Sequence, residues 1–326
     1  MKKLITCLLT ATLLVTTATG CSGNGLSAGS ATSGKILYIV TDLNDTFRAT
    51  LSEEIQAQAS AQGVTLDMVE TGNSVEEQAA QVAQAKSAGY SAIILRLSDA
   101  STALQMNVAS NGLPIIYVNN QPDDEHLSAD EFIFVGSDEE QAGQYQAEYV
   151  LNKLGNPASM DVIIFEGEEG HSGTIGRTDS VKENLKESGC DVNYVFVDYA
   201  NWSDTEAQAK FDIFMKTGQN VDAIFCNNDT MALGVIEGMK EHGLDYSKIP
   251  VCGVDATSDG CASIEAGEMS FTVLQNAEGQ ASAAVHAASV LASGDSIKSV
   301  ENATEDCKYI FVPFESVDSS NVSQYK

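Results

Sequence analysis

The sequence predicts an α/β protein built from two doubly wound parallel-sheet domains. Three observations lead to this prediction. Short apolar runs alternate with helix-length amphipathic stretches, the apolar runs lack clean polar alternation, and the same rhythm occurs twice along the chain. Apolar runs of this kind are typical of strands covered on both faces, and the helices between them supply the crossovers that a parallel sheet requires. A βα order that is repeated in this way indicates two domains of similar architecture.

The expected strands form two series, one in each half of the chain. The first series covers residues 35–40, 64–69, 92–95, 114–118 and 132–135, and the second covers 161–165, 194–197, 223–226, 250–254 and 271–274. The expected helices between and after them cover residues 74–88, 139–154, 204–216, 229–242 and 281–291.

The N-terminus predicts export and lipidation. A short basic start precedes a largely apolar run over residues 4–15, and small residues lead directly into Cys21. This pattern is typical of a lipoprotein signal peptide, so we expect residues 1–21 to be the signal with Cys21 as the lipidated residue. An ordinary cleaved signal with a chance cysteine is the alternative. Residues 22–34 are small and polar, which predicts a flexible tether between the membrane and an extracytoplasmic protein.

Charge and cysteine content exclude several classes of protein. The formal net charge of −29 repels phosphate backbones, so we expect no nucleic-acid partner. No apolar run approaches the roughly 18 to 20 residues that a membrane-spanning helix needs. The cysteines beyond Cys21 are odd in number and include no CxxC pair, which supports neither a disulfide framework nor a thiolate zinc site. These cysteines are Cys190, Cys226, Cys252, Cys261 and Cys307.

Polar and aromatic side chains follow the carboxyl ends of strands in both series. Open α/β sheets bind ligands at this edge, and two such edges that face each other make a cleft. Arg177 stands six residues after His171, at the expected start of a helix. In the first series the residues are Asp45, Phe47, Asn119 and Asn120, and in the second they are His171, Trp202, Asn228, Asp255 and Gln275.

These residue types suit a polyhydroxylated ligand. Asp and Asn side chains match hydroxyls that both donate and accept, and Arg177 can bond a ring oxygen while it pairs with a carboxylate. Trp202 and Phe47 can cover the apolar C–H faces of a sugar ring from opposite sides. Helix capping is an alternative role for Asp45, Asn228 and Asp255 taken singly. Capping does not explain why aromatic, amide and acidic residues recur at the same strand ends in both halves.

A hydrolase is a less favoured alternative. Residues 170–174 (GHSGT) approach the G-x-S-x-G nucleophile elbow, and Ser172 is followed by Asp255 and His286 in hydrolase order. However, Thr174 replaces the last glycine, and His286 falls within the Ala-rich helix pattern 281–291. The sequence therefore predicts a binding protein and no enzyme.

Several motifs in the same order carry a resemblance to a known family. They are 134–138 (FVGSD), 166–171 (EGEEGH), 227–234 (NNDTMALG), 249–256 (IPVCGVDA) and 272–275 (TVLQ). From about residue 35 onward the chain resembles the type I periplasmic binding proteins of the sugar class, most of all their galactose/glucose-binding members. The resemblance implies two lobes joined by three hinge strands, with crossings near Ser137, Gln275 and Phe311. The lobes would be 35–137 plus 276–311 and 138–275 plus 312–326.

The function that the resemblance implies is capture of a monosaccharide, most of all a galactose- or glucose-like hexose, by a monomer that delivers it to an ABC permease. A sugar sensor that serves a membrane kinase or a chemoreceptor is the alternative. No cofactor is implied. The implied sugar contacts are Asp45, Phe47, Asn119, His171, Arg177, Trp202, Asn228, Asp255 and Gln275, with Asn120 and Arg96 as further candidates.

The chain also departs from the galactose-binding pattern. Gly173 stands where that pattern has an aspartate that reads the anomeric end, and Gln275 stands where it has an asparagine. Asn120 replaces a lysine, and Arg96 replaces an asparagine. Arg96 would either favour a different or acidic sugar or pair with a local carboxylate, and the second is preferred. The acidic calcium loop has no counterpart in residues 151–160 (LNKLGNPASM), so we expect no metal.

Overall fold

The computed structural model describes residues 34–325. The predicted signal peptide, the lipidated Cys21 and nearly all of the predicted tether lie outside the described residues. Among the helices of residues 34–325, none combines the length and the apolar character needed to cross a bilayer.

The first sheet is entirely parallel, and its strand order is β11-β5-β4-β3-β1-β2. Its strands are β1 (Lys35–Val40), β2 (Leu66–Glu70), β3 (Tyr90–Leu95), β4 (Ile115–Val118), β5 (Phe132–Gly136) and β11 (Tyr309–Phe311). The helices that pack on it are α1 (Thr46–Ala61), α2 (Val75–Ala85), α3 (Ala103–Ala109) and α9 (Ala277–Ala292). Short 3-10 helices occur at η1 (Ala100–Thr102), η2 (Asp124–His126) and η3 (Ile297–Ser299).

The second sheet has the order β12-β10-β9-β8-β6-β7, with β12 antiparallel to β10 and the other pairs parallel. Its strands are β6 (Ser159–Glu166), β7 (Asp191–Tyr199), β8 (Ala223–Cys226), β9 (Val251–Cys252), β10 (Phe271–Leu274) and β12 (Glu315–Asp318). Its helices are α4 (Glu139–Lys153), α5 (Ser172–Glu187), α6 (Asp204–Met215), α7 (Asp229–Glu241) and α8 (Ser258–Glu265), and η4 (Val322–Gln324) lies near the C-terminus.

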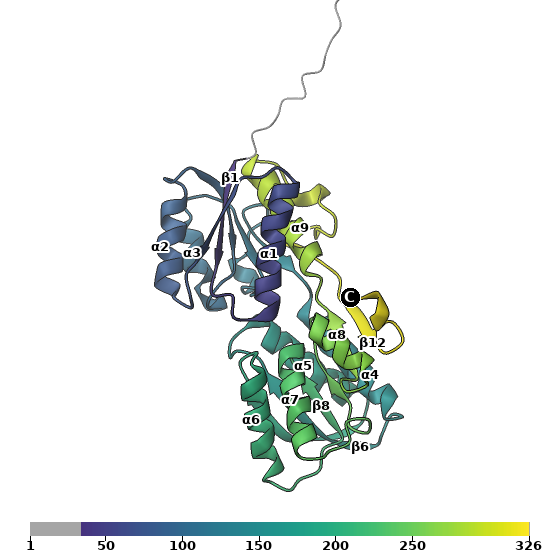
Figure 1. Cartoon of the computed structure of the whole chain (residues 1–326). Helices are drawn as coiled ribbons and strands as arrows, with labels where there is room; N and C mark the ends of the chain where they lie inside the picture. The colour runs from purple at the N-terminus through teal and green to yellow at the C-terminus, as the bar shows by residue number, and fades with distance from the viewer. Residues whose placement is uncertain (1–33, 326) are drawn as a thin grey trace, which may run out of the picture. The chain divides into compact units, whose positions relative to one another are not determined.

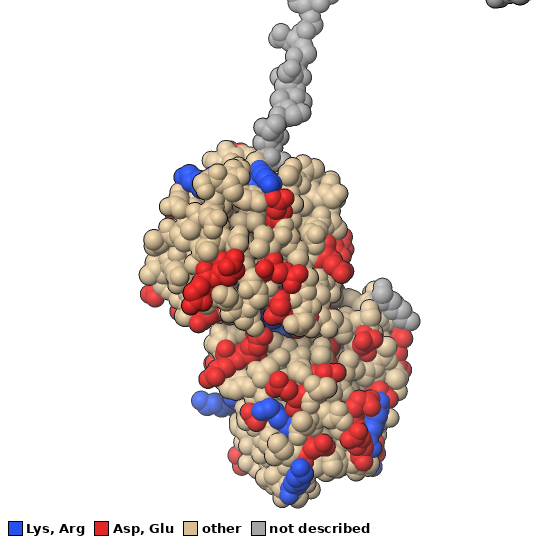
Figure 2. Space-filling view, turned by 60° about the vertical axis from the view of Figure 1, so that its left-hand side comes forward, with Lys and Arg blue, Asp and Glu red and all other residues tan. Residues whose placement is uncertain are grey.

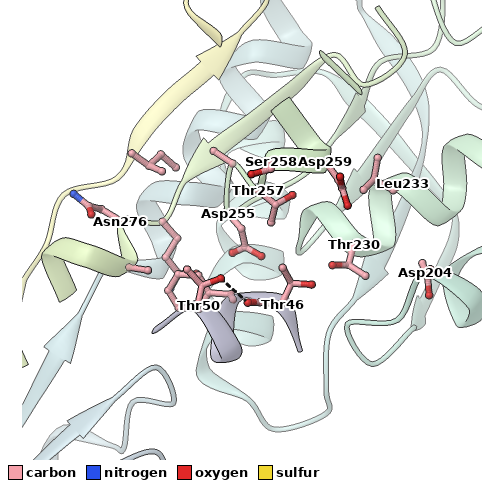
Figure 3. Close-up of a pocket in the computed structure, with 15 residues that line it drawn as sticks. Thr46, Thr50, Asp204, Thr230, Leu233, Asp255, Thr257, Ser258, Asp259 and Asn276 are labelled. Atoms are coloured by element: carbon pink, nitrogen blue, oxygen red, sulfur yellow. Dashed lines mark hydrogen bonds between the residues drawn. The ribbon is translucent and has the colours of Figure 1, made fainter. Parts of the chain in front are cut away.

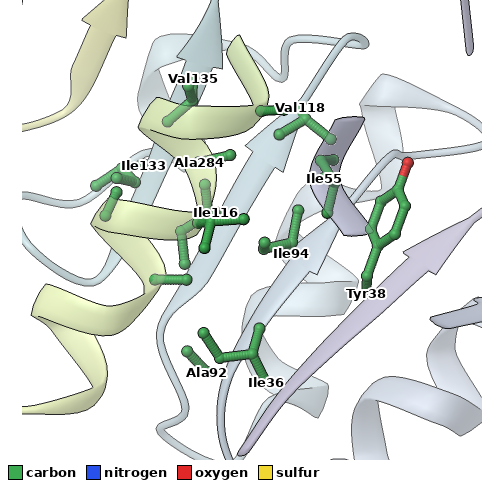
Figure 4. Packing of buried hydrophobic residues seen from close by; sticks show 14 of the residues in the cluster. Ile36, Tyr38, Ile55, Ala92, Ile94, Ile116, Val118, Ile133, Val135 and Ala284 are labelled. Carbon is green, nitrogen blue, oxygen red and sulfur yellow. The ribbon is translucent and has the colours of Figure 1, made fainter. Parts of the chain in front are cut away.

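Both faces of each sheet are covered by helices, which explains the uniformly apolar strands. In β1, Ile36 and Tyr38 belong to the core under α1 and α9, whereas Leu37 and Ile39 belong to the core under α2 and α3. Figure 4 shows the first of these cores, where Ile55 of α1 and Ala284 of α9 lie against the strands. Figure 1 shows α1 and α9 together on one side of this sheet, with α2 and α3 on the other. The predicted fold class is confirmed.

The strands differ in length from the prediction at a few places. The predicted strand 250–254 is reduced to β9. Backbone bonds to β10 continue beyond it, from the Gly253 N–H to the Phe271 carbonyl at 2.9 Å and from the Asp255 N–H to the Val273 carbonyl at 2.7 Å. A Cβ on Gly253 would lie 2.2 Å from a carboxylate oxygen of Asp229. The edge strand β7 is longer than predicted, and its half-exposed residues explain why an apolar run identified only its centre.

The chain passes between the two sheets three times, after β5, after β10 and after β11. This connectivity places loops from the carboxyl ends of both sheets against each other. The predicted lobe boundaries at residues 137, 275 and 311 remain a prediction.

Most of the surface charge is negative. Figure 2 shows Asp and Glu side chains spread over one face of the molecule, with fewer Lys and Arg side chains among them.

Candidate functional site

Loops from both sheets surround a central cavity with a volume of about 20 Å³. A cavity of this size holds about one water molecule, so a ring-sized ligand enters only when the surrounding loops move apart. Nine of its ten lining residues are among the predicted contacts, and Arg48 is the tenth. The lining residues are Asp45, Phe47, Arg48, Asn119, His171, Arg177, Trp202, Asn228, Asp255 and Gln275.

Three lining residues also cap helices. Capping and lining coexist for Asp45 and Asn228, whereas α8 is capped by Thr257 and not by Asp255. Asp45 Oδ1 accepts from the Arg48 backbone N–H at the start of α1, at 2.8 Å. Asn228 Oδ1 accepts from the Met231 N–H at the start of α7, at 2.9 Å. Each cap uses one side-chain oxygen and leaves the other end of the group for the cavity. The second oxygen of Asp45 is therefore an acceptor, and the Asn228 amide nitrogen is a donor.

His171 caps α5 in the same way, and the cap determines its tautomer. Its Nδ1 accepts from the Gly173 N–H at 3.0 Å. Burial lowers the pKa of His171 well below its usual value, and the nearby guanidinium groups lower it further. The ring is therefore neutral, and its proton is on Nε2. His171 also contacts the Trp202 ring edge to face, at 5.2 Å between centroids.

Arg177 makes three side-chain hydrogen bonds in the cavity wall. Its Nε donates to Glu139 at 2.6 Å, its Nη1 donates to the Asn227 carbonyl at 2.6 Å, and its Nη2 donates to Gln275 Oε1 at 3.0 Å. Asp255 lies 3.9 Å from Nη1. The carboxylates of Glu139 and Asp255 outweigh burial and raise the pKa of Arg177, so the guanidinium stays charged.

Glu139 supplies the carboxylate that pairs with Arg177. It begins α4, and a Cβ built on Gly173 would lie 3.5 Å from its Oε1. Glu139 therefore lies beside Gly173, but it is not among the residues that line the cavity.

Asp255 lies on a strained turn that Asp229 holds in place. The φ angles of Asp255 and Ala256 are 117° and 52°, in a region that residues with side chains rarely adopt. The buried Asp229 carboxylate accepts from the Thr257 N–H at 2.8 Å and from the Thr272 hydroxyl at 2.5 Å. Such strain persists where surrounding bonds fix it, and it concentrates at functional sites.

Burial raises the pKa of both carboxyl groups in this part of the wall. The pKa of Asp229 is raised to about 7, although its threonine hydrogen bonds oppose the shift. The pKa of Asp255 is also raised by burial, and the Arg177 guanidinium opposes that shift. Asp255 is therefore a poorly solvated carboxyl, and a hydroxyl that donates to it would favour its charged form.

The indole of Trp202 packs directly on the backbone of Gly167. Trp202 has a φ angle of 62°, and Asn119, on the other side of the cavity, has one of 63°. A Cβ placed on Gly167 would lie 2.1 Å from Cη2 of the indole. Only glycine at position 167 leaves the ring room to lie where it does.

We expect Gly167→Ala to push the indole away from this position and to weaken ligand binding by roughly tenfold or more, since bulky side chains rarely absorb such overlap without displacement. The measurement is ligand affinity by calorimetry. Gly170→Ala, in the same loop, is the control, because its Cβ meets no atom within 4 Å, although its φ of 77° adds strain. Equal affinity of the two variants would contradict this role of Gly167.

Glu168 joins the two sheets' loops through two buried arginines. Its carboxylate lies 3.4 Å from Nη2 of Arg48 and 3.4 Å from Nη2 of Arg96. The arginine side chains are 3% and 1% exposed, whereas that of Glu168 is 32% exposed. A second link lies beside it, where Ser172 N donates to Asn120 Oδ1 and Ser172 Oγ accepts from Gln121 N.

Arg96 and Asn120 therefore lie outside the cavity lining, unlike the other predicted contacts. Arg96 pairs with a carboxylate, as preferred from the sequence, and the partner is Glu168, which is 72 residues away along the chain. Arg96 Nε also donates to Asn119 Oδ1 at 3.2 Å, which turns the Asn119 amide nitrogen toward the cavity. Both residues support lining residues and the contact between sheets.

We expect Glu168→Gln to weaken ligand binding by about tenfold, because a charge-assisted hydrogen bond is worth about 1.5 to 3 kcal/mol before solvent screening. The affinity of the variant should also depend less on salt than that of the unsubstituted protein. Calorimetry at low and high salt measures both effects, with Glu169→Gln in the same loop as the control. An unchanged affinity with an unchanged salt dependence would contradict a role in closure.

The residues of the hydrolase alternative do not come together. The Ser172 hydroxyl accepts from the Gln121 backbone, and Asp255 lines the central cavity. His286 is exposed on α9, in a separate hollow beside Ser299 and Asn302. The serine, the aspartate and the histidine thus lie in three different surroundings.

Arg48, Glu139 and Glu168 were not identified from the sequence. Glu168 belongs to the acidic motif 166–171, and Arg48 directly follows Phe47, so both were adjacent to residues that were identified. Glu139 had a weaker signal, because an acidic residue in the first turn of a helix is common for reasons unrelated to ligands.

Within residues 34–325, three side chains at the exposed η2 turn lie close enough together to hold a metal ion. The ligand atoms of Asp123, Glu125 and His126 lie within 4.8 Å of one another. Exposed acidic groups often lie this close without an ion, so the expected absence of a metal remains a prediction.

The fold and the cavity between two strand-end loops define the class of protein. The family model described as the periplasmic binding protein domain matches residues 36–296, and the chain belongs to this family.

Several known proteins are similar in sequence to most of this chain. It is 29% identical to a putative rhizopine-binding protein of Rhizobium meliloti, over 81% of this chain and 83% of that protein. It is 28% identical to the D-galactose/methyl-galactoside-binding periplasmic protein of Haemophilus influenzae, over 96% of this chain and 98% of that protein. The chain also matches the solved structure of an ABC transporter solute-binding protein of Bacillus halodurans with bound myo-inositol. The TM-score is 0.80 at 28% identity, and the match covers 91% of this chain and 98% of that protein.

Proposed function

We propose that this chain is the extracytoplasmic sugar-binding component of an ABC transporter. Its ligand would be a neutral ring that carries several hydroxyls, either a galactose- or glucose-like hexose or a cyclitol. The observation that carries the proposal is the orientation of hydrogen-bonding groups around the central cavity.

Four groups are turned so that they donate into the cavity. The oxygens of Asn119, Asn228 and Gln275 already accept bonds from the protein, so their amide nitrogens remain as donors. His171 adds its Nε2 proton, because its Nδ1 accepts from Gly173. The acceptors are the free oxygen of Asp45 and the carboxyl of Asp255.

A ring with hydroxyls on its edge fits this arrangement. Each hydroxyl can accept two hydrogen bonds while it donates one, so hydroxyls can donate to the two carboxyls and accept from the four donors. A buried group left without its partner costs about 1 to 3 kcal/mol, so turning one hydroxyl should weaken binding by about tenfold to a hundredfold. Stereochemical selectivity would arise from this penalty.

The aromatic side chains suit the faces of such a ring. Phe47 enters the cavity from the first turn of α1, and Trp202 enters from the loop after β7. Aromatic rings cover the apolar C–H faces of sugars, and cyclitols present similar faces. The names of the relatives, which include binders of galactose, rhizopine and myo-inositol, support a ligand of this class.

Delivery to a permease would depend on closure around the ligand. The Glu168 contacts and the Ser172–Asn120 contact link the loops of the two sheets beside the cavity. A ligand that bonds both sides would favour the closed form, and membrane subunits could distinguish that form from the open one. Anchoring through a lipidated Cys21 would hold the protein near those subunits and remains part of the proposal.

Trp202 offers the direct test of the proposal. As the only tryptophan of the chain, it should report ligand entry by a change in intrinsic fluorescence. The panel is D-galactose, D-glucose, D-ribose and myo-inositol, with calorimetry to confirm each hit. Trp202→Phe is the control, since it should abolish the fluorescence change. A panel that produces neither a fluorescence change nor a thermal shift would refute the proposed ligand class.

A further inference from the structure

A wide groove adjoins the central cavity and is not used by the proposed function. It has a volume of about 510 Å³ and shares Phe47, Asp255 and Gln275 with the cavity. Figure 3 shows the side chains that surround it. Its walls come from α1, from the first turns of α6, α7 and α8, and from the segment between β10 and α9.

The chemistry of the groove resembles that of the cavity. Phe47, Leu233 and Leu274 supply apolar surface. Thr46, Thr230 and Ser258 supply hydroxyls from the first turns of three helices that are capped by other residues, so the fold does not need these hydroxyls as caps. Apolar patches beside hydroxyls suit the faces and edges of a sugar ring.

The carboxyl groups of the groove disfavour anionic substituents. Asp204, Asp255 and Asp259 line it, and Lys, Arg and His are absent from its described lining. A phosphate or carboxylate on the ligand would meet these carboxyls without a cationic partner. The carboxyls therefore exclude an anionic occupant, and the hydroxyls and apolar patches suit a neutral, hydroxylated one.

We propose that the groove is a second subsite, which takes a neutral glycosidic substituent on the ring bound in the central cavity. This inference rests on the proposed function, because the substituent can occupy the groove only when the ring that carries it is bound in the central cavity. Asp255 and Gln275 contribute to both spaces. A glycosidic oxygen carries no proton for the Asp255 carboxyl, so the substituent leaves the ring at an oxygen that accepts from the Gln275 amide nitrogen.

The test compares unsubstituted rings with their glycosides by calorimetry. The unsubstituted probes are D-galactose, D-glucose and myo-inositol, and the substituted probes are lactose, melibiose, cellobiose and galactinol, with galactose 1-phosphate as the anionic probe. At least one neutral glycoside should bind within about tenfold of its best unsubstituted ring, and galactose 1-phosphate should bind more weakly than that glycoside.

A blocking variant ties the result to the groove. Thr50 is exposed on α1 and lines the groove but not the central cavity, so Thr50→Trp should fill the groove. It should leave binding of the unsubstituted ring within about twofold and weaken binding of the glycoside by roughly tenfold or more, since a steric clash discriminates against the larger ligand. Ala57→Trp, an exposed position two turns further along α1, is the control and should affect neither.

The outcomes separate the two proposals. Tight binding of an unsubstituted ring with loss of every glycoside by more than about a hundredfold would overturn the subsite alone. Equal binding of the glycoside to Thr50→Trp and to the unsubstituted protein would also overturn it. Failure of every unsubstituted ring and every glycoside would overturn the proposed function and the subsite together.

Discussion

Asp255→Ala should strongly weaken ligand binding while the protein stays folded. Asp255 lines both the cavity and the groove, and it lies 3.9 Å from Arg177. A hydrogen bond to a charged group contributes about 1.5 to 3 kcal/mol, so its loss should weaken binding by roughly tenfold to a hundredfold. The ligand hydroxyl that donates to Asp255 would lose its acceptor.

Stability should change much less than affinity in this variant. Arg177 keeps its bond to Glu139, and removing a carboxyl whose pKa burial already raises relieves a desolvation cost. Thermal unfolding and calorimetry with the ligand found by the fluorescence panel measure the two effects. Asp259→Ala, an exposed carboxylate of the same groove, is the control. Retained affinity in Asp255→Ala would show that the carboxyl only shapes the turn.

Arg177→Met should destabilise the folded protein by about 3 to 5 kcal/mol, because it leaves the buried Glu139 carboxylate without a cation. It should also abolish binding, since Gln275 and the Asn227 carbonyl lose the donor that orients them. Urea denaturation measures the free energy of unfolding.

A double variant distinguishes charge from packing. Arg177→Met combined with Glu139→Leu removes both charges and should recover most of the lost stability, since a buried ion pair can often be replaced by apolar side chains at little cost. Lys182→Met is the matched control on α5. Its half-exposed pair with Glu166 should contribute at most about 1 kcal/mol. If Arg177→Met lost less than about 1 kcal/mol of unfolding free energy, Glu139 would not be held as a buried charge.

Much of the fold could be predicted because its signals are local. Strands such as 35–40 and 223–226 were predicted with the bounds that they have, since a strand covered on both faces is apolar at every position. Strand β9 is shorter than predicted, although the bonds of Gly253 and Asp255 to Phe271 and Val273 continue the pairing with β10.

The cavity residues could be predicted for a related reason. A parallel sheet brings the carboxyl ends of its strands to one edge, so residues that directly follow strands converge whatever the details of packing. Asp45, Asn119, Asn228 and Asp255 all satisfy this rule and all line the cavity. That they bind a ligand remains a prediction.

The sequence by itself determined the fold class and the identity of the side chains at the strand ends, because both depend on neighbours along the chain. Only the tertiary structure decided that Glu139 pairs with Arg177, that Glu168 joins Arg48 and Arg96, and that the Asn119 oxygen accepts from Arg96. These features depend on contacts between residues tens of positions apart, and local patterns contain no information about such contacts. The orientations of His171 and Asn228, in contrast, come from bonds to Gly173 and Met231 within their own helix starts.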